Sequence, residues 1–148
     1  MTAKSFVDTN VLVYAYDDGD RAKRDQAREL VRAGIESGLG VISTQIMQEF
    51  YSAVTRKKRM PPLEAKTALR EMDGFEIVTI NPTLVLEAVD NSILNQLSFW
   101  DALVLTTAAA AECGTLYSED LQHGQTILGV RIVNPFQIPT GTTKTKRL

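Results

Sequence analysis

Cysteine and histidine are almost absent from this chain, which carries one of each, Cys113 and His123, in 148 residues. A single cysteine excludes an intramolecular disulfide, and the two residues together cannot build a multi-thiolate or multi-histidine metal site. Carboxylates are the only metal ligands present in number, since 18 residues are Asp or Glu. Their hard oxygen atoms favour Mg²⁺ or Mn²⁺ over zinc or copper.

Long apolar runs are lacking as well. The longest largely apolar stretch, residues 102–111, is far shorter than the roughly 20 residues that span a bilayer. The N-terminus enters a β-prone run without the apolar region of a signal peptide, so we expect a cytoplasmic protein with no membrane partner. The net charge of −2 neither indicates nor excludes a nucleic-acid partner.

Short apolar runs alternate with helical patterns along the chain, which predicts an α/β fold with a mainly parallel sheet. The expected strands are residues 4–7, 40–43, 76–80, 115–118 and 131–133. The expected helices are residues 11–16, 21–37, 62–72, 82–96 and 99–112, together with one that follows Thr44 and ends in the basic residues 56–59. The expected caps are Asp20, Thr44, Asn81 and Ser98. We expect one domain over residues 1–139, followed by a flexible basic tail over residues 140–148.

Four acids fall where such a fold builds its sites. Asp8 ends the first strand and Asp120 follows the fourth, while Glu49 and Asp101 lie in the first turns of two helices. The carboxyl ends of parallel strands border one crevice, so the four side chains are expected to converge there. Singly, each has an ordinary explanation as a helix cap, a solvated helix acid or a turn residue.

Clustered carboxylates repel one another, and a divalent cation removes this conflict. Such a cation also lowers the pKa of a bound water and neutralises charge on a phosphate, which are the two needs of phosphodiester hydrolysis. The pattern therefore predicts Mg²⁺ or Mn²⁺ held by these acids, with one ion or two left open.

Four segments, in this order and spacing, carry a resemblance to a known family. They are residues 6–14 with Asp8-Thr9-Asn10, residues 48–50, residues 99–103 and residues 116–121. From about Lys4 to Phe136 the chain resembles the PIN-domain ribonucleases, and is most similar to VapC-type toxins of type II toxin–antitoxin pairs. The resemblance implies a Rossmann-like, three-layer fold, Mg²⁺- or Mn²⁺-dependent endonuclease activity on RNA, a homodimer, and a small VapB-like antitoxin.

The resemblance also implies roles for single residues. Carried over by position, the family's catalytic and metal-binding acids are Asp8, Glu49, Asp101 and Asp120. Glu119 stays open as an alternative to Asp120, which is favoured because it follows Ser118 by two residues. Hydroxyls near the metal-bound water would come from Thr9 and Ser118, and Asn10 would hydrogen-bond to the acids.

Two other functions compete with this interpretation. A haloacid-dehalogenase-type phosphatase also carries an acid at a strand end, but its second Asp is replaced here by Asn10, and there is little room for a cap domain. A catalytically silent interaction module with the same fold predicts the loss of one or more acids, and all four are present.

Several further residues have a plain structural interpretation. The four consecutive cations Arg56, Lys57, Lys58 and Arg59 suit either a solvated helix end or contact with the RNA backbone. We expect Cys113 in the core and His123 in a surface loop. Trp100 and Tyr117 are expected to be packing residues and not base-stacking platforms.

Overall fold

The computed structural model describes residues 3–137, so the predicted basic tail at residues 140–148 lies outside the described residues. The strands are β1 (Lys4–Val7), β2 (Gly40–Ser43), β3 (Glu76–Val78), β4 (Cys113–Tyr117), β5 (Thr126–Ile127) and β6 (Val130–Val133). The helices are α1 (Thr9–Tyr14), α2 (Arg21–Ser37), α3 (Thr44–Arg56), α4 (Pro62–Arg70), the 3₁₀ helix η1 (Glu71–Gly74), α5 (Pro82–Asn95) and α6 (Phe99–Ala110).

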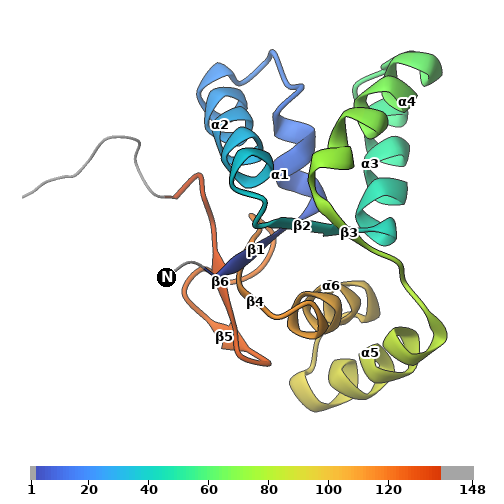
Figure 1. Cartoon of the computed structure of the whole chain (residues 1–148), viewed down its shortest axis with the longest axis vertical. Coiled ribbons are helices and arrows are strands. Elements are labelled where there is room, and N and C mark those ends of the chain that lie inside the picture. Colours follow the sequence, from blue (N-terminus) through green and yellow to red (C-terminus); the bar gives the residue numbers. More distant parts are fainter. Residues whose placement is uncertain (1–2, 138–148) are drawn as a thin grey trace, which may run out of the picture.

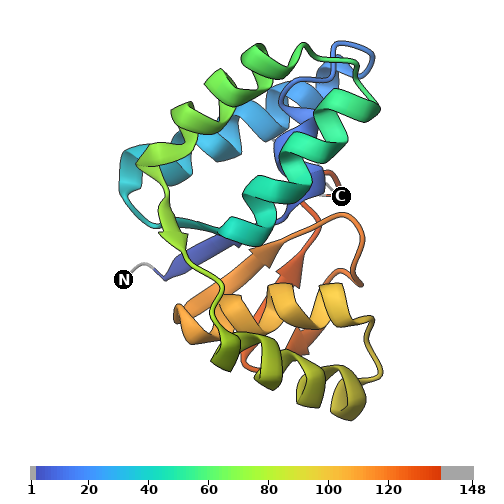
Figure 2. The ribbon, with the colours of Figure 1, turned by 90° about the vertical axis from the view of Figure 1, so that its right-hand side faces the viewer.

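A six-stranded sheet with the order β3-β2-β1-β4-β6-β5 forms the centre of the fold. Every strand pair is parallel except β5 with β6. Helices α1 to α4 lie on one side of this sheet, and α5 and α6 lie on the other (Figures 1 and 2). The predicted α/β fold with three layers and a mainly parallel sheet is therefore confirmed.

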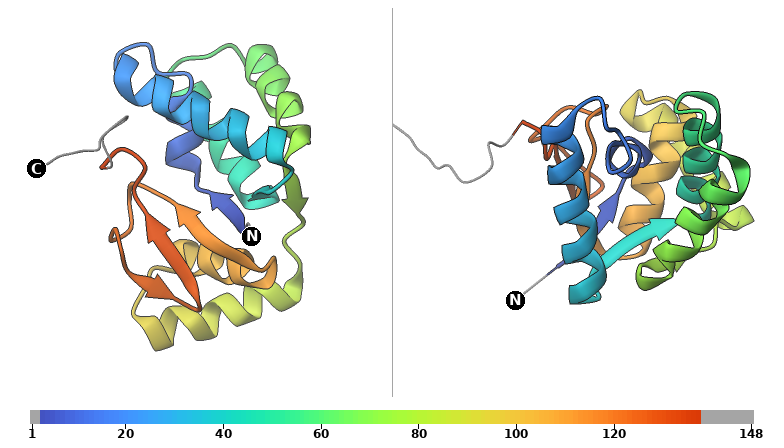
Figure 3. Two further views of the ribbon diagram at one scale, coloured as in Figure 1. Left: turned by 60° about the vertical axis from the view of Figure 1, so that its left-hand side comes forward. Right: turned by 90° about the horizontal axis from the view of Figure 1, so that it is seen from above.

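The sheet order places β1 and β4 side by side at the centre, although more than 100 residues separate them. Both strands run in the same direction, so their carboxyl ends lie at one edge, as the view from the side of β4 and β6 shows (Figure 3). Phe6, Val7 and Leu116, from these two strands, are at most 1% exposed and form part of the main hydrophobic core. A packed core beneath this edge fixes the positions at which the following residues leave the strands.

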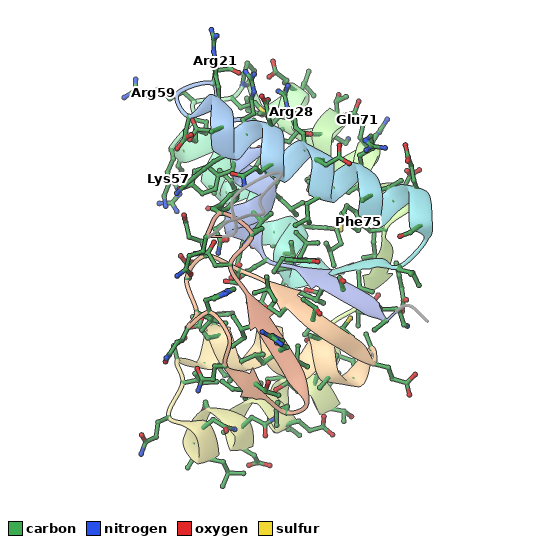
Figure 4. The ribbon with its side chains drawn as sticks, turned by 90° about the vertical axis from the view of Figure 1, so that its left-hand side faces the viewer. Arg21, Arg28, Lys57, Arg59, Glu71 and Phe75 are labelled. Atoms are coloured by element: carbon green, nitrogen blue, oxygen red, sulfur yellow. The ribbon has the colours of Figure 1, made fainter. Side chains whose placement is uncertain are left out.

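Two glycines allow close packing between α2, β2 and the segment that leads into β3. A Cβ atom added to Gly40 would lie 2.7 Å from the ring of Phe75, and one on Gly34 would lie 3.3 Å from it. Figure 4 shows Phe75 beneath the C-terminal half of α2. The two glycines therefore let α2 and β2 approach the segment that leads into β3.

The predicted elements differ from the observed ones in several details, including α1, which begins at Thr9 and not at residue 11, and β4, which begins at Cys113 and not at residue 115. Ser43, not Thr44, caps α3, with its Oγ accepting from Ile46 N at 3.3 Å; the Thr44 hydroxyl instead accepts from Ile80 N. The third strand ends at Val78, before the predicted residue 80. The strand β5 was missed, because its hairpin turn has positive φ at Leu128 (55°) and Gly129 (78°), and leucine is not a residue that signals such a turn.

Among residues 3–137, no helix is both long enough and apolar enough to cross a membrane.

Candidate active site

Asp8 is the centre of the candidate site. It follows β1 as the N-cap of α1, is only 7% exposed, and its backbone N–H bonds to the Tyr117 carbonyl of β4. Three groups hold its carboxylate: Thr9 N donates to Oδ1 at 2.8 Å, Ser118 Oγ donates to Oδ2 at 2.8 Å, and Asn10 Nδ2 lies 3.4 Å from Oδ2. The carboxylate is therefore fixed in orientation by both central strands.

Asn10 links Asp8 to the segment that follows β4. Its Nδ2 donates to Asp120 Oδ2 at 3.1 Å, and its Oδ1 accepts from Glu119 N at 3.0 Å. The Asp120 backbone N–H also donates to Ser118 Oγ at 3.2 Å. One amide side chain thus brings the first and fourth predicted acids to the same place.

Glu49 reaches the site from the second turn of α3. Both of its carboxylate oxygens are held, because Thr9 Oγ1 donates to Oε1 at 2.8 Å and Gln45 Nε2 donates to Oε2 at 3.1 Å. Thr9 therefore joins Asp8, through its backbone, to Glu49, through its hydroxyl.

The arrangement of the acids raises the pKa of Asp8 from 3.8 to about 6. Burial is the largest cause, and the negative charges of Glu49 and Asp120 add to it, while the bonds from Ser118 and Thr9 act in the opposite direction. Above pH 6 the folded protein holds a buried negative charge beside two further acids, which a bound cation would relieve.

Glu119 is directed away from this cluster. Its Oε2 accepts a hydrogen bond from Lys23 Nζ, which also lies 3.4 Å from the Tyr14 hydroxyl. The same ammonium group lies 4.8 Å from the centroid of the Tyr14 ring and 5.3 Å from that of Phe136. The negative charge of Glu119 is therefore paired with Lys23, whereas Asp120 bonds to Asn10 beside Asp8.

Asp101 is placed differently from the other three acids. It lies in the first turn of α6, where its backbone N–H donates to the capping Ser98 Oγ at 3.1 Å. The neighbouring Trp100 carbonyl accepts from Gln45 Nε2 at 3.3 Å, the same nitrogen that bonds Glu49, so this turn lies close to Glu49. No hydrogen bond to the Asp101 carboxylate occurs within residues 3–137.

The structure thus brings Asp8, Glu49 and Asp120 into one hydrogen-bonded cluster and leaves the Asp101 carboxylate outside it. In the described part of the chain, no three His, Cys, Asp or Glu side chains are close enough in this arrangement to hold one metal ion. Three of the acids are linked through Thr9 and Asn10, and not by direct contact.

A cavity of about 390 Å³ opens beside the cluster. Its acidic and polar lining includes Thr9, Asn10, Glu49, Glu119, Asp120 and Asp17. Lys57 and Lys58 line it from the end of α3, and Lys58 Nζ also pairs with Asp17 at 2.9 Å. A mixed lining of acids and lysines is suited to a ligand with negative charge that also coordinates a cation.

The four consecutive cations at residues 56–59, here called the basic run, differ in whether they line this cavity. Arg56 Nε donates to Ser52 Oγ at 3.2 Å on its own helix, and Arg59 adopts a positive φ of 54° where the chain leaves α3. Figure 4 shows Lys57 and Arg59 on the same side of the molecule, but of the four cations only Lys57 and Lys58 are among the residues that line the cavity.

The remaining predictions had mixed outcomes. Cys113 is buried, as predicted, and burial raises the pKa of its thiol to about 11. His123 is exposed in a loop, as predicted, where its Nδ1 accepts from Asn134 N. Trp100 was wrongly predicted to be a packing residue: the residue is 60% exposed at the first turn of α6, although its ring forms an edge-on pair with Phe99 at 5.1 Å between centroids.

Two residues of the site were missed from the sequence. Gln45 bonds Glu49, and its spacing of four residues on one helix face is the signal that could have revealed it. Lys23, the partner of Glu119, lies 96 residues away in the chain, and no local pattern points to that pairing.

The chain matches one family profile and shares its fold with several solved structures. The PIN domain family profile matches residues 5–126. No curated protein matches the sequence at a significant level.

Solved structures with this fold come from several organisms. A toxin–antitoxin complex from Klebsiella pneumoniae is 24% identical, with 91% of this chain and 100% of that chain covered and a TM-score of 0.68. VapC20 of Mycobacterium tuberculosis, described as a toxin that cleaves the sarcin–ricin loop, is 17% identical, with 79% and 90% covered and a TM-score of 0.65. DNA-bound VapBC from Salmonella typhimurium is 14% identical, with 88% and 97% covered and a TM-score of 0.64.

Proposed function

Because the chain belongs to the PIN domain family, we propose that it is a metal-dependent endoribonuclease that acts as the toxin of a toxin–antitoxin pair. The observation that carries the proposal is the convergence of Asp8, Glu49 and Asp120 at the carboxyl ends of β1 and β4, around a buried Asp8 whose pKa is raised to about 6. VapC20, a toxin of the same fold described as cleaving the sarcin–ricin loop, supports the activity, and the toxin–antitoxin complex from Klebsiella pneumoniae supports the toxin role.

The residues present fit Mg²⁺ or Mn²⁺. The donors at the site are carboxylate, hydroxyl and amide oxygens, which hard divalent cations prefer, and a buried carboxylate with two acidic neighbours is an anionic cradle in need of positive charge. Asp8, Glu49, Asp101 and Asp120 would hold the ion after their carboxylates move closer together than in the described arrangement. When bound, it would supply a water of lowered pKa and neutralise charge on the scissile phosphate.

The chain's own residues then have distinct tasks. Asn10 and Ser118 hold Asp8 and Asp120 in place, and Thr9 orients Glu49. The free lone pairs of the Glu49 carboxylate would accept a proton from the attacking water. As the water oxygen bonds to phosphorus, the bond from phosphorus to the 3′-oxygen breaks and this oxygen takes a proton from solvent water, leaving a 5′-phosphate and a 3′-hydroxyl.

Lys57 and Lys58 would bind the RNA backbone at this site. Their ammonium groups line the same cavity as Glu49 and Asp120, so a phosphate that reaches the acids also comes within reach of these lysines. This assigns the RNA-contact role, first considered for the whole run of residues 56–59, to its two central members.

A second copy of the chain and an antitoxin are the expected protein partners. The fold is shared with toxin–antitoxin complexes, which supports a small VapB-like antitoxin in the cytoplasm. Apolar side chains gather on the outer face of α5, where Leu86 is 67%, Ile93 71% and Leu94 77% exposed, and such a patch supports a homodimer. Sedimentation of the purified chain would give the mass of two copies.

Cleavage of RNA tests the proposal directly. The protein is incubated with end-labelled RNA in Mg²⁺, in Mn²⁺ and in a chelator, alongside Asp8→Asn. We expect internal cuts with 5′-phosphate ends only with metal and only from the wild type. Cleavage that persists unchanged in the chelator or in Asp8→Asn would refute it, and turnover of small phosphomonoesters instead of RNA would favour the phosphatase.

A further inference from the structure

Gln45 is a buried amide whose hydrogen bonds are directed at the candidate site. It is the second residue of α3, is 4% exposed, and lies four positions before Glu49 on the same helix. Its Nε2 lies 3.1 Å from Glu49 Oε2 and 3.3 Å from the Trp100 carbonyl in the first turn of α6. One nitrogen therefore joins the acid of α3 to the turn that carries Asp101.

The orientation of this amide is fixed by its two acceptors. A carboxylate oxygen and a backbone carbonyl both require a donor, so the amide cannot be turned over without placing its own oxygen against them. In the present orientation, Gln45 Oε1 is buried without a hydrogen-bond partner in residues 3–137. The side chain of Gln45 therefore makes hydrogen bonds only through Nε2, to Glu49 and to the Trp100 carbonyl. Burial of its unpaired Oε1 does not stabilise the fold.

The bond to Glu49 completes the restraint on that carboxylate. Thr9 Oγ1 donates to Oε1 at 2.8 Å, so with Gln45 absent the group would be held at one oxygen and could rotate about its last torsion. Glu49 is half-buried and lines the cavity that also contains Asp120. A carboxylate held at both oxygens presents its remaining lone pairs in one direction.

We infer that Gln45 is a positioning residue, which aims the Glu49 carboxylate at the cation site. The inference rests on the proposed function and assigns a role to a residue outside the predicted site. A purely structural role makes a different prediction: replacing Gln45 would then alter stability and leave metal affinity unchanged.

The first test is Gln45→Met, which keeps the length of the side chain and removes both hydrogen bonds. Gln48→Met is the matched control, since Gln48 lies on the exposed face of the same helix. Mn²⁺ affinity is measured by titration calorimetry on the full chain, and the melting temperature is measured without metal. We expect Gln45→Met to bind Mn²⁺ about 10-fold more weakly, the loss typical of an outer-shell partner, and Gln48→Met to match the wild type.

The melting temperature separates the two roles. Methionine removes the unpaired buried oxygen but also the donor to Glu49 and to the Trp100 carbonyl, and because these effects oppose each other we expect a melting temperature close to that of the wild type without metal. Weaker Mn²⁺ binding at an unchanged melting temperature supports the inference. Wild-type affinity in Gln45→Met overturns it.

A double-mutant cycle keeps the test decisive if the single variant is destabilised. In a Glu49→Ala background Gln45 has no carboxylate to orient, so Gln45→Met should then change Mn²⁺ affinity less than about 2-fold. An equal loss in both backgrounds would overturn the inference. A wild-type chain that binds no Mn²⁺ would contradict the proposed function itself, which is a distinguishable result.

Discussion

The candidate site has a strand side, around Asp8 at the end of β1, and a helix side, around Asp101 in the first turn of α6. The two sides differ in how firmly hydrogen bonds hold the carboxylate in the absence of a cation. On the strand side, the Asp8 carboxylate accepts hydrogen bonds from Thr9 and Ser118 and is buried. On the helix side, the Asp101 carboxylate accepts none within the described residues, and only the backbone of its turn is fixed, by Ser98 and through Gln45.

The same fold therefore holds the Asp8 carboxylate in one orientation and leaves the Asp101 carboxylate without a hydrogen bond that would fix it. Asp8 gains its position from the two central strands, at the cost of a buried charge. Asp101 gains its position from the cap of α6 and keeps its carboxylate free for a ligand. We therefore expect the two acids to matter alike for activity and differently for stability.

The largest effect should come from Asp8→Asn. Removing this charge takes away the proposed central metal ligand, so RNA cleavage should fall by more than about 100-fold, beyond the usual cost of losing an outer-shell partner. The melting temperature without metal at pH 7.5 should rise, because a neutral amide replaces a buried anion. Cleavage rates and a thermal melt measure both, and a wild-type rate would remove Asp8 from the site.

Asp101→Asn should lower cleavage to a similar degree with little change in stability. Its carboxylate has no hydrogen bond in the described structure, so only the weak interaction of its charge with the N-terminal end of α6 is lost. A melting temperature several degrees below that of the wild type would contradict the proposed difference between Asp8 and Asp101. Unaffected cleavage would also contradict the proposal, since Asp101 would then be only a residue of the first helical turn.

The pH dependence of stability should separate the two sides again. Asp8 has a pKa of about 6 when folded and 3.8 as its ordinary value, so the folded state binds the proton more tightly. Its contribution is fully present below pH 4 and is lost as the pH rises through 6, a change of about 3 kcal/mol for the metal-free protein. Urea melts at pH 5 and 7.5 should detect about half of this change, because the contribution is already partly lost at pH 5, and Asp8→Asn is the variant that should lack this component.

The smallest effect should come from the basic run. Lys57→Ala should weaken RNA binding by several-fold and reduce the salt dependence by about one counterion, because Lys57 lines the cavity beside the acids. Arg59→Ala is the matched control and should bind RNA as the wild type does. Filter binding at several salt concentrations gives the slopes, and equal losses in both variants would contradict the division of the run.

The strand side of the site was also the part most open to prediction from sequence. Asp8 lies at the end of a short apolar run, and strand ends in a parallel sheet share one edge, so its position followed from the pattern. The pairing of Glu119 with Lys23 did not, since it depends on where α2 packs against the loop after β4. The sequence left Glu119 and Asp120 as alternatives, and side-chain direction is what separates them.

In the fold, too, features with a local sequence signal were predicted, and features that depend on contacts between distant residues were not. The strands and caps with ordinary signals, such as residues 40–43 and the Asn81 cap before Pro82, were predicted at the observed places. Trp100 was misjudged because its exposure depends on what covers the first turn of α6, which no local pattern encodes. Gln45 differs from Trp100, because its four-residue spacing from Glu49 was a local signal that was missed, and only its contact with the Trp100 carbonyl, 55 residues away, is long-range.

Titration of the metal-free chain with Mn²⁺ tests the central claim most directly. The account predicts saturable binding of one or two ions by the wild type, with loss of that binding in Asp8→Asn and an increase in the wild-type melting temperature as Mn²⁺ is added. A wild-type chain that takes up no Mn²⁺, or an Asp8→Asn chain that binds it equally well, would contradict it.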